Sequence, residues 1–124
     1  MADYTAVKFD DLFAMTASAT ITGGTLVTAS GNGTVAPSTT GDHSIGVAAH
    51  DAASGASVSI WPLSGYQHEV QVQTGTIAAG APVIAGTTGF ANTGALATVA
   101  AAGTLLGIAT VGATSPAKVR FIGV

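Results

Sequence analysis

The sequence predicts an all-β protein, a small β-barrel or sandwich built from two related halves and preceded by an extended N-terminal arm. Three observations lead to this fold class. Short runs rich in Val, Ile and Thr are separated by Gly, Asn, Ser and Pro. Several runs alternate apolar and polar residues, and a near-repeat recurs about sixty positions apart. We expect the arm over residues 1–22 and one β domain over residues 23–124, with quasi-repeats at about 23–64 and 77–124.

The N-terminal segment, residues 1–22, differs from the rest of the chain. It holds four of the nine charged side chains and no glycine. Phe9, Leu12 and Phe13 fit helical spacing, which favours a first strand or short helix packed on the body. The alternative is an arm that leaves the body and docks on a partner, since twenty extended residues reach about 66 Å. The residues leave both interpretations open.

The first copy of the repeat begins with the apolar run Thr25–Thr28. The turn that follows contains Asn32-Gly33, a pair that suits the positive φ angles of a tight hairpin. Two further strands are predicted around Ile45–Ala48 and Val58–Ile60. Glycine in the middle of the first of these, Gly46, indicates a bulge or a close backbone approach.

The second copy matches the first at nearly constant offsets. Leu106-Gly-Ile-Ala109 lies 61 positions after Ile45-Gly-Val-Ala48, and Gly107 matches the mid-strand glycine. Val119-Arg-Phe121 matches Val58-Ser-Ile60 at the same offset, and Gly80-Ala-Pro-Val83 matches Gly24-Thr-Leu-Val27 at an offset of 56. Two such copies, joined through residues 65–76, predict one small barrel or sandwich of two related sheets.

Two strands of this expected domain alternate clearly. In His68–Thr74, Val70 and Val72 fall on one face and the polar residues on the other. In Ala117–Ile122, Val119 and Phe121 point inward while the two basic residues point outward. After Gly23 no segment predicts an amphipathic helix with caps, because Gly103 and β-branched neighbours interrupt the alanine-rich run at 97–102.

The stretch from Ala95 to Val111 is uncharged and close to the shortest length of a membrane span. It contains three Thr and two Gly, and insertion is driven by Leu, Ile, Phe and Val instead of Ala and Thr. Part of it is also the second copy of a predicted strand pair. We therefore expect a core segment and no membrane partner.

The composition excludes several classes of function. Three Lys and Arg cannot neutralise a run of phosphates, so no nucleic-acid partner is expected. Soluble domains carry about 25% charged residues, whereas this chain carries 7%. The sequence has no Cys, and its first residues have an acid where a signal peptide needs a cationic start. We expect synthesis in the cytoplasm of the producing cell and a surface largely covered by other protein.

No constellation for catalysis or metal binding stands out. His43, His50 and Asp51 could ligate a metal, but their spacing matches no recognised ligand pattern. Asp42, His43 and Ser44 are chain neighbours, which rarely face one another, and the Gly-x-Ser-x-Gly elbow is absent. We predict no enzyme activity, no cofactor and no metal.

Trp61 and Tyr66 form an aromatic pair that is close in sequence, at the junction of the two copies. Aromatic residues of this kind anchor interfaces or stack on sugars. They also close the core of a small barrel that has few large side chains. The sequence favours the core position and leaves the interface role as the alternative.

The order of these motifs resembles the cement, or decoration, proteins of tailed-phage capsids. The resemblance covers about residues 23–124 and departs from the family pattern at Ala81, where an acidic residue commonly follows the glycine. It is carried by Ile45-Gly-Val-Ala48, Asp51-Ala-Ala-Ser-Gly55, Val58-Ser-Ile60, Thr74-Gly-Thr-Ile-Ala-Ala-Gly-Ala-Pro-Val83 and Leu106-Gly-Ile-Ala109.

The resemblance implies a β-barrel or β-tulip fold, often trimeric, that binds the outer surface of the capsid and stabilises the lattice of the major capsid protein without catalysis. The expected partners are the major capsid protein and further copies of the chain, as a homotrimer on the virion. It also implies a terminal arm that contacts the capsid or a neighbouring subunit. The matching apolar residues are Tyr4, Val7, Phe9, Leu12, Phe13 and Met15.

The alternative function is a carbohydrate-binding or adhesive β module on a virion or cell surface. Trp61 and Tyr66 would then form the platform on which a sugar stacks.

Overall fold

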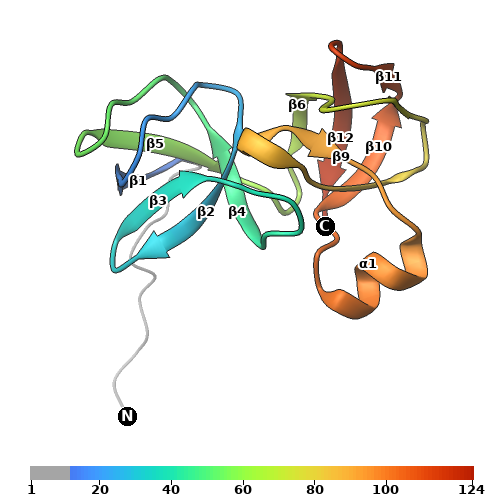
Figure 1. Cartoon of the computed structure of the whole chain (residues 1–124), viewed down its shortest axis with the longest axis horizontal. Coiled ribbons are helices and arrows are strands. Elements are labelled where there is room, and N and C mark those ends of the chain that lie inside the picture. The colour runs from blue at the N-terminus through green and yellow to red at the C-terminus, as the bar shows by residue number, and fades with distance from the viewer. Residues whose placement is uncertain (1–11) are drawn as a thin grey trace.

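The structure is a computed structural model that describes residues 12–124. The chain forms two β lobes that lie side by side, with strands β1 to β5 in the first and β6 to β12 in the second (Figure 1). The expected all-β architecture of two related halves is confirmed.

The first lobe is a closed barrel of five strands in the order β1-β3-β2-β4-β5. β1 runs parallel to β3, and the other neighbours are antiparallel. Residues Asn32 and Gly33 form the predicted tight turn between β2 and β3. The strands are β1 (Phe13–Ala17), β2 (Leu26–Gly31), β3 (Thr34–Pro37), β4 (Ser44–Ala48) and β5 (Ser57–Pro62).

The second lobe contains a five-stranded sheet in the order β6-β12-β10-β8-β9 and a small sheet of β11 and β7. One parallel bridge between Val72 and Ala91 brings the β6 and β9 ends together. The elements are β6 (Gln67–Gln71), β7 (Thr76–Ile77), β8 (Pro82–Ala85), the 3-10 helix η1 (Thr87–Gly89), β9 (Ala91–Asn92), α1 (Leu96–Ala102), β10 (Gly107–Val111), β11 (Ala113–Thr114) and β12 (Lys118–Gly123).

The internal repeat is present in the strand register. Val27 pairs with Gly46 in the first lobe, and the matching residues Val83 and Gly107 pair in the second. Gly46 also pairs with Pro62, as Gly107 pairs with Gly123. β2, β4 and β5 are therefore the structural counterparts of β8, β10 and β12.

The repeat begins earlier in each copy than the sequence predicts. β1 pairs with β5 as β6 pairs with β12, so Phe13 opposite Ile60 corresponds to His68 opposite Phe121. Residues Phe13–Ala17 of the segment predicted as an arm thus form a barrel strand. β6 likewise belongs to the second half, although the sequence placed it in the joining segment.

Each lobe has its own hydrophobic core, and the two cores are built from equivalent positions. The strand alternation turns these side chains inward in both copies. The eight buried residues of the first core are Ala17, Ile21, Val27, Val35, Ala48, Ala52, Val58 and Ile60. Their counterparts Val72, Ile77, Val83, Ala91, Ala109, Val119 and Phe121 are buried in the second core, and Ala113 packs against it.

Gly46 lies in the middle of β4, and its counterpart Gly107 is the first residue of β10. A Cβ on Gly46 would overlap the carbonyl oxygen of Trp61, and one on Gly107 would overlap that of Ile122. Both glycines are buried, so the neighbouring strand has no room to retreat. The predicted close backbone approach is confirmed at both positions.

The main difference between the copies is an insertion between β9 and β10. The repeat offset is 55 between β1 and β6, 56 from Ile21 and Ile77 up to β9, and 61 from β10 onward, so the second copy has five additional residues between β9 and β10. Helix α1 occupies this segment and packs against β8, with Val99 buried. The helix ends at Gly103, whose φ is 73°. No helix in residues 12–124 has the length and apolar character needed to cross a membrane.

Candidate functional site

The two lobes are joined by apolar side chains that cross from the first lobe into the second core. Leu26 on β2, Val47 on β4 and Leu63 after β5 belong to the core cluster of the second lobe. Leu26 and Val47 are register partners on the outer side of the first barrel. The lobes therefore form one packed body, since separating them would expose part of the second core.

The C-terminal end of β12 closes the same junction through backbone contacts. The N–H of Gly65 donates to the carbonyl of Gly123 (3.1 Å), and the N–H of Gly123 donates to the carbonyl of Tyr66 (2.9 Å). A Cβ on Gly123 would overlap the backbone of Leu63. The segment between the lobes is thus fixed to the last strand of the chain.

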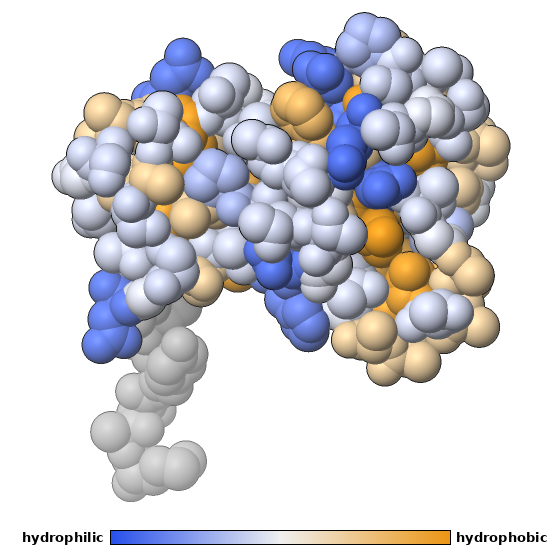
Figure 2. Space-filling model, viewed as in Figure 1, coloured by the Kyte–Doolittle hydropathy of each residue, from blue (hydrophilic) through white to orange (hydrophobic). Residues whose placement is uncertain are grey.

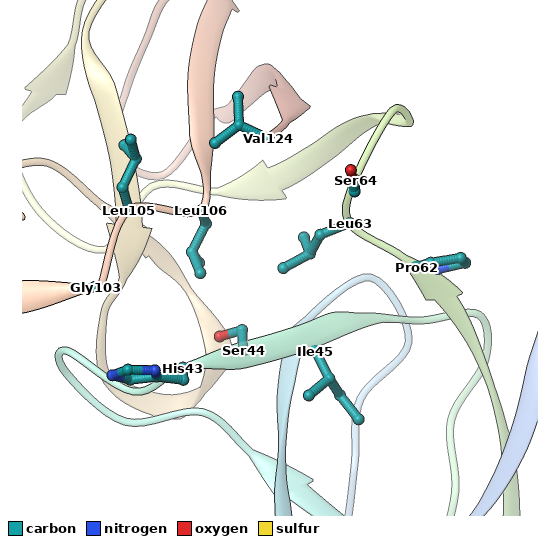
Figure 3. Close-up of a pocket in the computed structure, with 10 residues that line it drawn as sticks. All are labelled: His43, Ser44, Ile45, Pro62, Leu63, Ser64, Gly103, Leu105, Leu106 and Val124. Carbon is teal, nitrogen blue, oxygen red and sulfur yellow. The ribbon is translucent and has the colours of Figure 1, made fainter. Parts of the chain in front are cut away.

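A groove of about 390 Å³ lies along this junction (Figure 3). One wall comes from the first lobe and the joining segment, with Ile45 and Leu63, and the other comes from the end of the second lobe, with Leu106 and Val124. Figure 3 shows that Leu63 and Leu106 approach each other from the two walls. Its lining mixes apolar side chains with His43, Ser44 and Ser64 and includes no Asp, Glu, Lys or Arg, so it suits contact with protein better than binding of an ionic ligand.

Four ring side chains, each close to the next, extend from the junction into the second core. The ring centroids are 5.9 Å apart for Trp61 and Tyr66, 6.4 Å for Tyr66 and His68, and 5.7 Å for His68 and Phe121. Trp61 and Tyr66 are half-buried and border a hollow of about 280 Å³. The same two rings therefore contribute to the junction and remain accessible to a partner.

His68 is the histidine in this series of rings, and its side chain is buried. Its Nε2–H donates to the carbonyl oxygen of Pro62 (2.9 Å), which ties β6 to the end of β5. Burial lowers the pKa of His68 below its usual value of 6.5, and the hydrogen bond to Pro62 offsets this only in part. The imidazole is therefore held in its neutral form within the junction.

The residues predicted for an arm fall into two groups. Tyr4, Val7 and Phe9 lie outside the described residues. Phe13 and Met15 lie on β1 and pack against the first core, and Leu12 is half-buried just before that strand. A contact of any of these residues with a capsid or another subunit stays a prediction.

Two of the three residues considered for metal binding, His50 and Asp51, hold loops in place through their side chains, whereas His43 is exposed. The backbone N–H of Ser59 donates to Nε2 of His50 (3.1 Å), and Nδ1 of His50 donates to the carbonyl of Asp51 (2.8 Å). The Asp51 carboxylate accepts from the N–H of Gly23 (2.7 Å). Across residues 12–124, no three His, Cys, Asp or Glu side chains lie close enough to hold a metal ion.

The residues considered for hydrolysis are not aligned for it. The hydroxyl of Ser44 is paired with that of Ser38 (2.7 Å), and the carboxylate of Asp42 accepts from the N–H and hydroxyl of Thr39 (2.8 and 2.9 Å). The Asp42 contacts stabilise the turn before β4. These hydrogen bonds give both side chains structural roles.

The junction residues Leu26, Val47 and Leu63 were not predicted from the sequence. One signal was present: Leu26-Val27 and Val47-Ala48 are consecutive apolar pairs, where a strand with one solvated face would alternate. Such pairs indicate strands covered on both faces. Which segment covers the second face could not be read from the pattern.

Comparisons with known proteins identify a matching family and a shared fold. A family model described as phage cement protein matches residues 6–124. A solved structure titled as the head fiber gp8.5 N base of bacteriophage phi29 matches with a TM-score of 0.66 and 18% sequence identity, over 91% of this chain and 92% of that one. The fold is therefore shared with that protein. Among curated proteins, none matches.

Proposed function

We propose that this chain, which belongs to the phage cement protein family, binds the outer surface of the phage head and links neighbouring subunits of the major capsid protein. The family is structural and non-catalytic, and its members act on the capsid of the virion. The observation that carries the proposal is the family match, which extends over almost the whole chain from residue 6 to residue 124.

The physical character of the body supports attachment to protein. Only 7% of the residues are charged, and the two lobes share a junction packed with apolar side chains. A rigid body of this kind loses little conformational entropy when it binds, so more of the contact energy remains as affinity. Many copies on a lattice also add their individually weak contacts.

The N-terminal segment is the proposed capsid-contact arm. Phe13 and Met15 pack on the first core, so the free contact residues in this proposal are those before β1. Tyr4, Val7, Phe9 and Leu12 supply apolar anchors in that segment. An extended segment with such anchors gains main-chain hydrogen bonds by strand addition and buries apolar area in pockets of its partner.

Self-association is the second element of the proposal, as a homotrimer on the shell. The family resemblance supports it, and so does the low charge, because neighbouring copies with a formal net charge of −3 repel one another weakly at physiological ionic strength.

The test uses heads assembled without this chain, to which the purified full-length protein is added. We expect the protein to sediment with the heads and to raise the temperature at which they open. A variant lacking residues 1–11 keeps β1 intact and should bind at least 10-fold more weakly. If the full-length protein neither binds nor stabilises heads, the proposed function is wrong.

A further inference from the structure

An apolar row crosses the outer side of the sheet in each lobe. In the first lobe, Val47 on β4 pairs with Leu26 on β2 and with Trp61 on β5. These side chains point away from the barrel core, because strand neighbours alternate between faces. Leu26 is 0% exposed and Val47 is 5% exposed, since the second lobe covers them.

The second lobe has the same row in the same register. Ile108 on β10 pairs with Pro82 on β8 and with Ile122 on β12. Val124 is the counterpart of Leu63, 61 positions later. We call Pro82, Ile108, Ile122 and Val124 the terminal face.

No part of the described chain covers the terminal face as the second lobe covers the first row. Ile122 is 41% exposed and Val124 is 63% exposed, whereas Leu63 is only 8% exposed. Helix α1, the insertion of the second copy, packs against β8 but leaves these side chains accessible. Figure 2 shows strongly hydrophobic residues at the surface of the second lobe, between polar residues above and helix α1 below.

The surroundings of the terminal face are those of a protein interface. The side chains of the face are uncharged, and the polar pairs Arg120–Glu69 (2.6 Å) and Gln67–Thr110 (3.4 Å) lie next to it on β6, β10 and β12. An apolar centre with a polar rim is the usual anatomy of a contact between proteins. Val124 also lines the groove opposite Leu63, so the face is continuous with the junction between the lobes.

We infer that a second copy of this chain covers the terminal face in the assembled particle. Within one chain, a β lobe of this same fold already buries the equivalent row, so a row at this register position can be covered by such a lobe. The side chains of the face add no charge that would repel another copy. This inference rests on the self-association in the proposed function and assigns it to named residues.

The test is the oligomeric state of the full-length protein, measured by sedimentation velocity from about 1 to 100 µM. We expect a species of several times the 11.9 kDa chain mass. The double variant Ile122→Glu/Val124→Asp should raise the dissociation constant at least 100-fold, because it places charge in the apolar centre. Val111→Glu is the matched control: Val111 is 52% exposed and lies beyond the bulge of β10, outside the face.

The possible outcomes distinguish a failure of this inference from a failure of the proposed function. An unchanged oligomer in the double variant, or an equal loss in the control, overturns the assignment of the face. A wild-type protein that stays monomeric at 100 µM but binds heads overturns self-association through the face and leaves the cement function standing. A circular dichroism melt of each variant verifies that both lobes stay folded.

Discussion

The two lobes have the same strand pairing and equivalent core positions, yet they are completed in different ways. The first lobe is a closed barrel that holds its own core. The second is an open sheet whose ends meet in one bridge, and three residues of the first lobe complete its core. Position in the repeat therefore decides burial: Leu26, Val47 and Leu63 of the first copy are buried, whereas their counterparts in the second copy are partly or largely exposed.

The largest expected effect is at Gly123, where the last strand meets the segment between the lobes. Gly123→Ala should destabilise the protein by about 3 kcal/mol or more, because the new methyl group overlaps the backbone of Leu63, which cannot move aside as a side chain would. Chemical denaturation measures the loss. Gly31→Ala is the control, since there the new methyl group meets only the movable hydroxyl of Thr34.

The next prediction compares equivalent residues of the apolar rows on the outer sides of the two lobes. Leu26→Ala and Leu63→Ala should each lower the free energy of unfolding by about 3 kcal/mol, because both leave a cavity at the edge of the second core. Val124→Ala, at the position equivalent to Leu63, should cost less than about 0.5 kcal/mol because the side chain is exposed. Equal losses at Leu63 and Val124 would contradict the comparison.

Trp61 and its counterpart Ile122 are another pair of equivalent positions whose contributions to stability should differ. Trp61→Ala should cost about 2 kcal/mol, since the half-buried ring packs against Tyr66 at the junction, whereas Ile122→Ala should cost less than about 1 kcal/mol. Thermal unfolding of the two variants measures the difference. A glycan array with the same Trp61 variant tests the carbohydrate-binding alternative, which gains support if the wild-type protein binds a glycan and the variant does not.

The smallest expected effect concerns pH. The pKa of His68 is lower in the folded protein than in the unfolded chain, mainly through burial. The unfolded state therefore binds more protons as the pH falls below about 6.5, and stability is complete above that pH and declines below it. His68→Phe, which copies the residue at the equivalent position Phe13, should flatten this part of the stability curve. An unchanged slope between pH 7 and pH 5 would show that another group is responsible.

Much of the fold could be predicted from the sequence because the repeat constrains it. The offset of 61 between Gly46 and Gly107 identified equivalent strands, and both glycines proved to lie under a neighbouring backbone. The change of offset from 56 to 61 falls where α1 lies, but no insertion was predicted from it. The short helix was not expected, since its seven residues have no side-chain cap and depend on packing against β8.

The junction could not be predicted in the same way. Leu26 and Leu63 are ordinary apolar residues, and nothing local distinguishes a side chain in its own core from one in the core of the neighbouring lobe. The strand β1 could not be predicted for a similar reason, because Phe9, Leu12 and Phe13 also fit a helical spacing. Only the pairing of β1 with β5 resolves this, and that contact is long-range.

The most direct test of the cement function is a cryo-EM map of phage heads carrying this chain. We predict two-lobed density on the outer surface of the shell, in contact with at least two subunits of the major capsid protein at each site and with the N-terminal segment against the shell. Density inside the head or on the tail, or its absence from heads that contain the protein, would contradict the proposed function.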